Sequence, residues 1–146
     1  MFKIVVQINK PANTVFAYLS NIEYSPRWYS AVKSVTKLSQ GPVNRGSLYS
    51  FSRELLGKQV DNRVEVTEFV DGKLLTLAST EGPTPFKYRY ELTPLGVTTQ
   101  LRLEGEISGG GVTGPIALLA PIASSFFERG MRTNLLILKD LIEEEL

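Results

Sequence analysis

Arg53, Tyr88 and Tyr90 are the side chains of this sequence best suited to chemistry. The chain has no cysteine and no histidine, which excludes thiolate nucleophiles, disulfides, Cys/His zinc sites and imidazole acid–base catalysis. An arginine can stabilise an anion or a polarised carbonyl, and a tyrosine hydroxyl can donate a hydrogen bond or a proton. Any reaction or polar recognition must therefore use such groups, or carboxylates, amides, hydroxyls and lysines.

A predicted hairpin decides where Arg53 points. A two-residue turn at Gly57-Lys58, with glycine first as type II′ turns prefer, predicts four inward cross-strand pairs: Tyr49–Val66, Phe51–Val64, Arg53–Asn62 and Leu55–Val60. Two interpretations of Arg53 stay open. A guanidinium facing an apolar interior suggests an anionic or carbonyl-bearing ligand. Alternatively, Arg53 lies close enough to the hairpin end to reach water with its charged head.

The tyrosines belong to a strictly alternating segment, Phe86 to Leu92, in which aromatic or aliphatic residues alternate with charged ones. Such alternation predicts a β-strand with one face on the core and one in water. Tyr88 and Tyr90 then point inward with Phe86. They either hydrogen-bond a ligand or serve as core residues with one polar tip.

The remaining pattern predicts the elements that hold these side chains. Phe2 to Ile8 is typical of a strand, and Pro11 to Ser20 of a short helix. Asn21 is placed to cap a second short helix, with Trp28 and Tyr29 near its end, where they either gate a cavity or cap the core. From Val32 to Glu106 the turn signals divide the chain into six further strands.

A long helix is predicted from Pro121 to Glu145, because apolar residues recur there at helical spacing. Phe127 and Met131 lie on its apolar stripe. Asn134 lies among apolar neighbours and either contacts a ligand or faces a polar part of the sheet. A flexible loop or flap is expected over Ser108 to Gly114, which lacks the lysine of a phosphate-binding loop.

Composition narrows the possible partners. The 146 residues have a net charge of +1 with the signs interspersed, which favours a solvated outer face and no nucleic-acid partner. The longest apolar run, Pro115 to Ala123, is too short to cross a membrane, and the N-terminus does not look like a signal peptide. We expect one domain over residues 1–146, a cytoplasmic location, no cofactor and no metal; the oligomeric state stays open.

The order of these elements resembles the START-like (SRPBCC) superfamily, in particular its polyketide cyclase/dehydrase and lipid-transport group. Pro11 to Leu19 is similar to the family's first helix, and Pro26-Arg27-Trp28 to its second. Val64 to Phe69 resembles its fourth strand, and Leu135 to Ile142 resembles the end of its last helix. The resemblance implies an α+β helix-grip fold: a seven-stranded curved antiparallel sheet around a long C-terminal helix, with two short helices after the first strand. It also implies a cavity for a hydrophobic small molecule.

The residues predicted to line that cavity are aromatic, apolar or uncharged-polar, apart from one arginine. They are Trp28, Tyr49, Phe51, Arg53, Asn62, Val64, Phe86, Tyr88, Tyr90, Phe127, Met131 and Asn134. Three functions remain open: a carrier or sensor of a lipid, polyketide or aromatic metabolite; a cyclase or dehydratase using Arg53 with Tyr88 or Tyr90; and an interaction module whose core is simply filled.

Overall fold

The computed structural model describes residues 1–55, 57–107 and 120–145. Its elements follow the order predicted from the sequence. They are β1 (Phe2–Ile8), α1 (Ala12–Leu19), the 3₁₀ helix η1 (Ile22–Arg27), β2 (Val32–Lys37), β3 (Leu48–Leu55), β4 (Lys58–Val70), β5 (Leu74–Glu81), β6 (Phe86–Leu95), β7 (Thr98–Ile107) and α2 (Ala120–Glu145). The Ser108–Gly114 segment, where a loop or flap is expected, lies outside the described residues.

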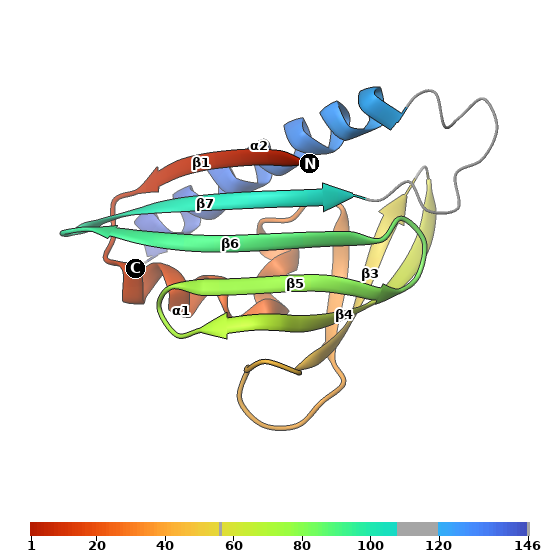
Figure 1. The fold of residues 1–146 in the computed structure, drawn as a ribbon, viewed down its shortest axis with the longest axis horizontal. Helices are drawn as coiled ribbons and strands as arrows, with labels where there is room; N and C mark the ends of the chain where they lie inside the picture. Colours follow the sequence, from red (N-terminus) through yellow and green to blue (C-terminus); the bar gives the residue numbers. More distant parts are fainter. Residues whose placement is uncertain (56, 108–119, 146) are drawn as a thin grey trace.

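The seven strands form one antiparallel sheet in the order β1-β7-β6-β5-β4-β3-β2, with β1 and β2 at its two edges. Register shifts interrupt β2 and β4, and such bulges bend a strand and increase its twist. The helices α1 and α2 lie on one side of the sheet, behind it in Figure 1. The predicted helix-grip architecture is therefore confirmed.

The core is formed by the alternating inward side chains of the strands and by the apolar residues that recur at helical spacing in α2. On β6 the side chains of Phe86, Tyr88 and Tyr90 are buried, while the charged residues between them face outward. The 26 residues of α2 make a rod about 39 Å long, enough to cross the sheet. Among the side chains of α2 that the structure describes, those of Met131, Asn134, Leu135, Leu138 and Ile142 are buried.

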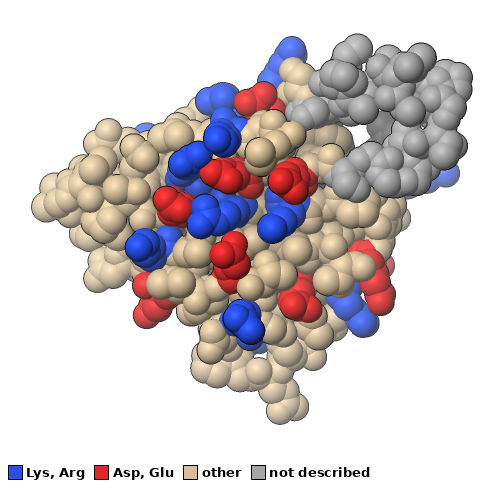
Figure 2. Space-filling model, viewed as in Figure 1, with Lys and Arg blue, Asp and Glu red and all other residues tan. Residues whose placement is uncertain are grey.

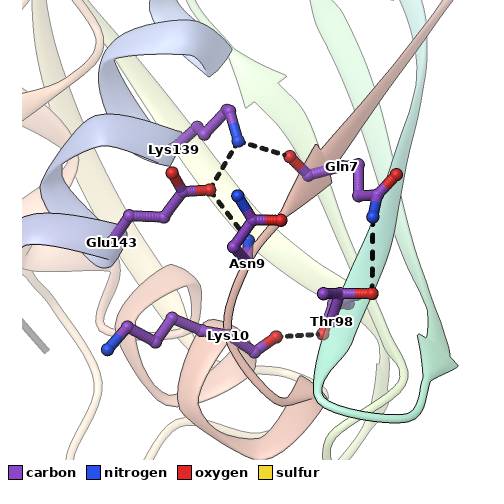
Figure 3. A network of polar contacts seen from close by, with 7 residues as sticks. Gln7, Asn9, Lys10, Thr98, Lys139 and Glu143 are labelled. Carbon is purple, nitrogen blue, oxygen red and sulfur yellow. Dashed lines mark hydrogen bonds and ion pairs between the residues drawn. The ribbon is translucent and has the colours of Figure 1, made fainter.

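A polar network fastens the C-terminal half of α2 to the end of β1 (Figure 3). One carboxylate oxygen of Glu143 accepts hydrogen bonds from Lys139 Nζ and from the backbone N–H of Asn9, the latter at 2.8 Å. Lys139 Nζ also donates to the carbonyl of Gln7 at 2.8 Å. The hydrogen bond from Lys139, followed by that from Asn9, lowers the pKa of the Glu143 carboxyl.

Glu143→Gln should therefore make stability depend on pH in a defined way. A carboxylate with a lowered pKa in the folded state stabilises the fold above its ordinary pKa of 4.5, and this contribution is lost as the pH falls through the folded-state value. At neutral pH the variant should lose up to about 1 kcal/mol in free energy of unfolding, since the pair is partly exposed. Urea unfolding at several pH values measures the difference, which should vanish well below pH 4.5. A difference that persists unchanged in acid would contradict this role.

The β3–β4 register differs from the predicted one by two residues. Tyr49 faces Val64, Phe51 faces Asn62 and Arg53 faces Val60, and Leu55 pairs with Lys58. Gly57 is thus the second residue of the turn, where its φ of +79° suits glycine, and Lys58 already belongs to β4. A shift of two residues keeps every side chain on its predicted face.

The outer face of the sheet carries charges of both signs, interleaved across its strands (Figure 2). Arg89 pairs with Glu68 and Glu91, and Arg102 with Glu104, in ion pairs that are all partly exposed. This mixed surface presents no extended basic stripe on the face shown. Among the described residues, no helix has the length and apolar character needed to span a membrane.

Candidate functional site

A small void lies in the interior, between the sheet and the segment that contains η1. Its volume is about 10 Å³, close to the space of one water molecule. The predicted residues that line it are Trp28, Phe51, Tyr88 and Tyr90; it is also lined by Leu19, Ser25, Tyr29, Leu75 and Leu77. The interior is therefore nearly filled by its own side chains, as the interaction-module hypothesis expects, although four of the nine lining residues carry a hydroxyl group.

Two tyrosine hydroxyls meet beside the void. The hydroxyls of Tyr29 and Tyr88 lie 3.1 Å apart and share a hydrogen bond. Burial raises the pKa of Tyr29, and it raises the pKa values of Tyr88 and Tyr90 well above the usual range of a phenol. All three phenols are therefore neutral at physiological pH, and they suit hydrogen-bond donation better than proton abstraction.

Arg53 lies next to this tyrosine pair, buried rather than extended to water. Only 5% of its surface is exposed. Its Nε and Nη2 donate to Asn62 Oδ1 at 3.0 and 2.7 Å, and Nη2 also donates to the carbonyl of Pro83 at 2.9 Å. Its positive charge acts against the burial effect on the pKa values of both Tyr29 and Tyr88, so the guanidinium and the two hydroxyls form one polar cluster.

Aromatic rings connect Arg53 to the void. The guanidinium carbon lies 5.1 Å from the centroid of the Phe86 ring, within the range of a cation–π contact. Phe86 in turn stacks on Tyr88 with centroids 5.0 Å apart and contacts Phe51 at 6.3 Å. Arg53, Asn62 and Phe86 are thus adjacent to the void without lining it.

The remaining predicted residues lie elsewhere in the core. Val64 and Met131 are buried, and Phe127 is partly buried against the core. The Oδ1 of Asn134 accepts a hydrogen bond from the backbone N–H of Ser30 at 3.2 Å, so Asn134 ties α2 to the chain just after η1. The structure does not bring these four side chains to the void, and a direct ligand contact for them stays a prediction.

Tyr49 borders a different depression. An open hollow of about 240 Å³ lies between α1, η1 and the β2–β3 connection, and Tyr49 forms part of its wall. The other wall residues are mostly polar: Ala17, Ser20, Asn21, Ile22, Glu23, Lys37 and Val43. Tyr49 is itself buried, and burial raises its pKa, with the charge of Glu23 adding to the effect.

The void includes residues that sequence reasoning did not assign to ligand binding. Tyr29 was expected only as a gate or core cap, yet its hydroxyl is central to the polar cluster. Its position after a proline-containing short helix and beside Trp28 is the one signal that marked it. Leu75 and Leu77 flank Thr76 on β5, and no motif in the sequence singles them out. Among the described residues, no group of three or more acidic side chains is arranged to hold a metal ion.

A family model described as polyketide cyclase/dehydrase and lipid transport matches residues 1–143. The chain belongs to this family. Its fold, with the sheet gripping α2, is the START/polyketide cyclase-like fold expected from the resemblance of its elements. No match was found among curated protein sequences.

The chain, as a member of the polyketide cyclase/dehydrase and lipid transport family, shares its fold with solved structures. The sequence identity to them is low. A protein of Thermus thermophilus is 18% identical, with a TM-score of 0.79 over 96% of this chain and 94% of its own. The Zhui aromatase/cyclase from a Streptomyces species is 15% identical, with a TM-score of 0.76 over 97% and 92% of the two chains. A START superfamily protein from Mycobacterium smegmatis is 20% identical, with a TM-score of 0.64 over 90% and 93%.

Proposed function

We propose that the protein binds a small hydrophobic molecule in its interior, between the sheet and the segment that contains η1, as a carrier or sensor. The observation that supports this most is the void at the centre of the core, bordered by aromatic rings and by the polar tips of Ser25, Tyr29, Tyr88 and Tyr90. Ligand sites are concave and mostly apolar, with a few placed polar groups, and this composition fits that description.

Polar groups in a core carry a cost that stability alone does not explain. A buried hydroxyl or guanidinium loses its hydration, and the loss is only offset when every donor and acceptor is paired. Apolar residues of similar volume would fill the same space without that penalty. A role in recognising the polar atoms of a ligand accounts for keeping Tyr29, Tyr88 and Arg53 together inside.

A ligand larger than water requires the interior to open. The void is walled on one side by sheet residues held in backbone ladders and on the other by Ser25, Trp28 and Tyr29. This segment includes part of the six-residue 3₁₀ helix η1, a conformation with poorer hydrogen-bond geometry than a sheet or an α-helix. Outward movement of this segment is therefore the least costly way to enlarge the site.

Binding can be tested with the chain's own fluorophore. Trp28 is the single tryptophan and lines the void, so a bound ligand should change its emission. We expect phenylnaphthylamine, a neutral apolar fluorophore, to bind with micromolar affinity or better, near about −8 kcal/mol. Native mass spectrometry of protein purified without detergent provides a second measurement. If neither method detects any bound apolar molecule, the proposal fails.

Matched substitutions locate the bound molecule. Leu77→Phe fills the void and should weaken probe binding by about tenfold or more. Leu95→Phe makes the same change at the exposed end of β6 and should leave binding unchanged. Leu77→Ala enlarges the void and should strengthen binding. Equal affinities for all three variants would place the probe elsewhere and contradict the site.

A cyclase or dehydratase reaction is the second candidate, favoured by the grouping of Arg53 with Tyr29 and Tyr88. In this mechanism the guanidinium stabilises an enolate and a neutral phenol donates a proton. The raised pKa values of the phenols make them poor bases, so the proton acceptor would have to come from elsewhere. Arg53→Ala and Tyr88→Phe should each slow turnover of a polyketide-like substrate; unchanged turnover in both would remove this candidate.

A further inference from the structure

Arg53 stands apart from every other charge in the chain. Among the described residues it is the only charged side chain that is buried. None of the ion pairs that the described residues form involves it. The undescribed positions 56, 108–119 and 146 contain no Asp or Glu, so they cannot supply an acidic side chain. The interior therefore holds a positive charge without a carboxylate side chain beside it.

The groups around the guanidinium hold it in place without neutralising it. Its hydrogen-bond acceptors are the amide oxygen of Asn62 and the backbone carbonyls of Pro83 and Thr84, all of them uncharged. These hydrogen bonds use Nε and Nη2, and the guanidinium also interacts with the uncharged hydroxyl of Tyr29. A buried cation costs free energy unless a counter-charge offsets it, so the site is built for an anionic partner.

The chain adopts strained backbone to create this arrangement. Thr84 has a φ of +52°, a rare conformation for a β-branched residue, and Gly82 has a φ of +111°. This β5–β6 connection lies over Asn62, whose Nδ2 donates to the Pro83 carbonyl at 2.9 Å and to Ser79 Oγ at 3.0 Å. Backbone strain of this kind persists where the surroundings over-determine it, often at ligand clamps.

The charge is directed toward the void through the tyrosine pair. The guanidinium lies over the Phe86 ring at 5.1 Å, Phe86 stacks on Tyr88 at 5.0 Å, and the hydroxyls of Tyr88 and Tyr29, which line the void, are 3.1 Å apart. An anionic oxygen entering between the hydroxyls and the guanidinium would meet neutral phenol donors on one side and the positive charge of Arg53 on the other. Hydrogen bonds to an ionised acceptor are stronger than neutral ones and favour such a head group over an alcohol.

We propose that the ligand is an amphipathic monocarboxylic acid, whose carboxylate binds Arg53 with the Tyr29 and Tyr88 hydroxyls while its apolar body occupies the enlarged void. This inference rests on the proposed function. One buried cation matches a single negative charge, whereas a phosphate monoester brings a charge of about −1.5 to −2 at neutral pH. The apolar body can be a fatty chain or an aromatic ring system, since the carboxylate is common to both.

Pairs of probes that differ only in the head group provide the test. Decanoic acid is compared with decanol, and naphthoic acid with naphthalenemethanol, by the change in Trp28 emission. At neutral pH one acid should bind at least about tenfold more tightly than its alcohol. This preference should disappear as the pH falls through the pKa of the free acid. Whichever pair prefers the acid identifies the body as a chain or a ring.

Variants assign the preference to the guanidinium. Arg53→Gln should remove the preference for the acid, so that the acid and its alcohol bind the variant with equal affinity. Arg63→Gln, on the exposed face of β4, removes an equal charge and should keep the preference. Arg53→Lys retains the positive charge and should keep part of the preference for the acid. This variant provides the test if Arg53→Gln does not fold.

The outcomes separate this inference from the proposed function. If the wild-type protein binds neither acid nor alcohol, and no other apolar probe, the proposed function itself fails. If it binds acid and alcohol equally well, the binding function stands and the carboxylate inference is overturned. A preference for the acid that survives Arg53→Gln also overturns it, because the charge would then lie elsewhere.

Discussion

Replacing Asn62 with leucine should lower the free energy of unfolding by about 3–5 kcal/mol, the range seen when one partner of a buried charged network is removed. Asn62 is fully buried, and its Oδ1 accepts hydrogen bonds from both Nε and Nη2 of Arg53. Leucine fills a similar volume but leaves the guanidinium with backbone carbonyls alone. Urea unfolding followed by circular dichroism measures the loss, at constant pH and salt.

Two controls separate the charge from the loss of an amide. Asn134→Leu removes a buried amide that bonds Ser30 and Met131 but no charged group, and it should cost only about 1–3 kcal/mol. The double variant Arg53→Met with Asn62→Leu should be more stable than Asn62→Leu alone, because no unpaired cation remains inside. The losses in free energy of unfolding caused by Arg53→Met and by Asn62→Leu are also measured separately. If these two losses simply add in the double variant, the two residues are not coupled and the polar cluster is not a unit.

Alternating patterns explain why the fold could be predicted. Phe86, Tyr88 and Tyr90 alternate with charged residues, so the inward face of β6 follows from the sequence alone. The apolar stripe of α2 repeats at helical spacing, and Leu135, Leu138 and Ile142 are fully buried as that stripe predicts. Both patterns are local, and each needs only the sheet or helix period to be interpreted.

The β3–β4 register shows where such patterns stop being informative. Pairings shifted by two residues bury the same side chains, so hydrophobicity cannot choose between them. Only the turn decides, and Gly57 suits either turn position because glycine tolerates positive φ in both. The inward orientation of Arg53 and Asn62 was predicted correctly for this reason, although their cross-strand partners were not.

The polar cluster depends on contacts between residues far apart in the sequence. Tyr29 and Tyr88 are 59 residues apart in the sequence. The Pro83 carbonyl, in the β5–β6 connection, accepts a hydrogen bond from Arg53, which lies 30 residues earlier. Nothing in the local pattern around Tyr29 indicates that its hydroxyl will meet another one. The size of the void is set by how closely rings such as Phe51 and Tyr88 pack, which composition and periodicity do not determine.

Gly82→Ala should destabilise the protein by about 3 kcal/mol or more, since it combines two independent penalties. The φ of +111° at this position is poorly accessible to alanine, at about 1–3 kcal/mol. A Cβ here would also lie 2.5 Å from the backbone oxygen of Asp61 and 2.8 Å from Asn62 Nδ2, and such overpacking costs about 1–3 kcal/mol more. The clash involves backbone, so a side-chain rotation cannot relieve it.

Gly72→Ala is the matched control for this glycine. Gly72 has a φ of +76° in the β4–β5 turn, but a Cβ there meets no atom within 4 Å. Gly72→Ala should therefore lower the free energy of unfolding in urea by only about 1–2 kcal/mol, the cost of the positive φ for alanine. Because Gly82 holds the Pro83 carbonyl against Arg53, Gly82→Ala should also weaken binding of the acid probes, whereas Gly72→Ala should not. Equal stability and equal binding in the two variants would mean that the close approach of the β5–β6 connection to Asn62 does not support the arginine.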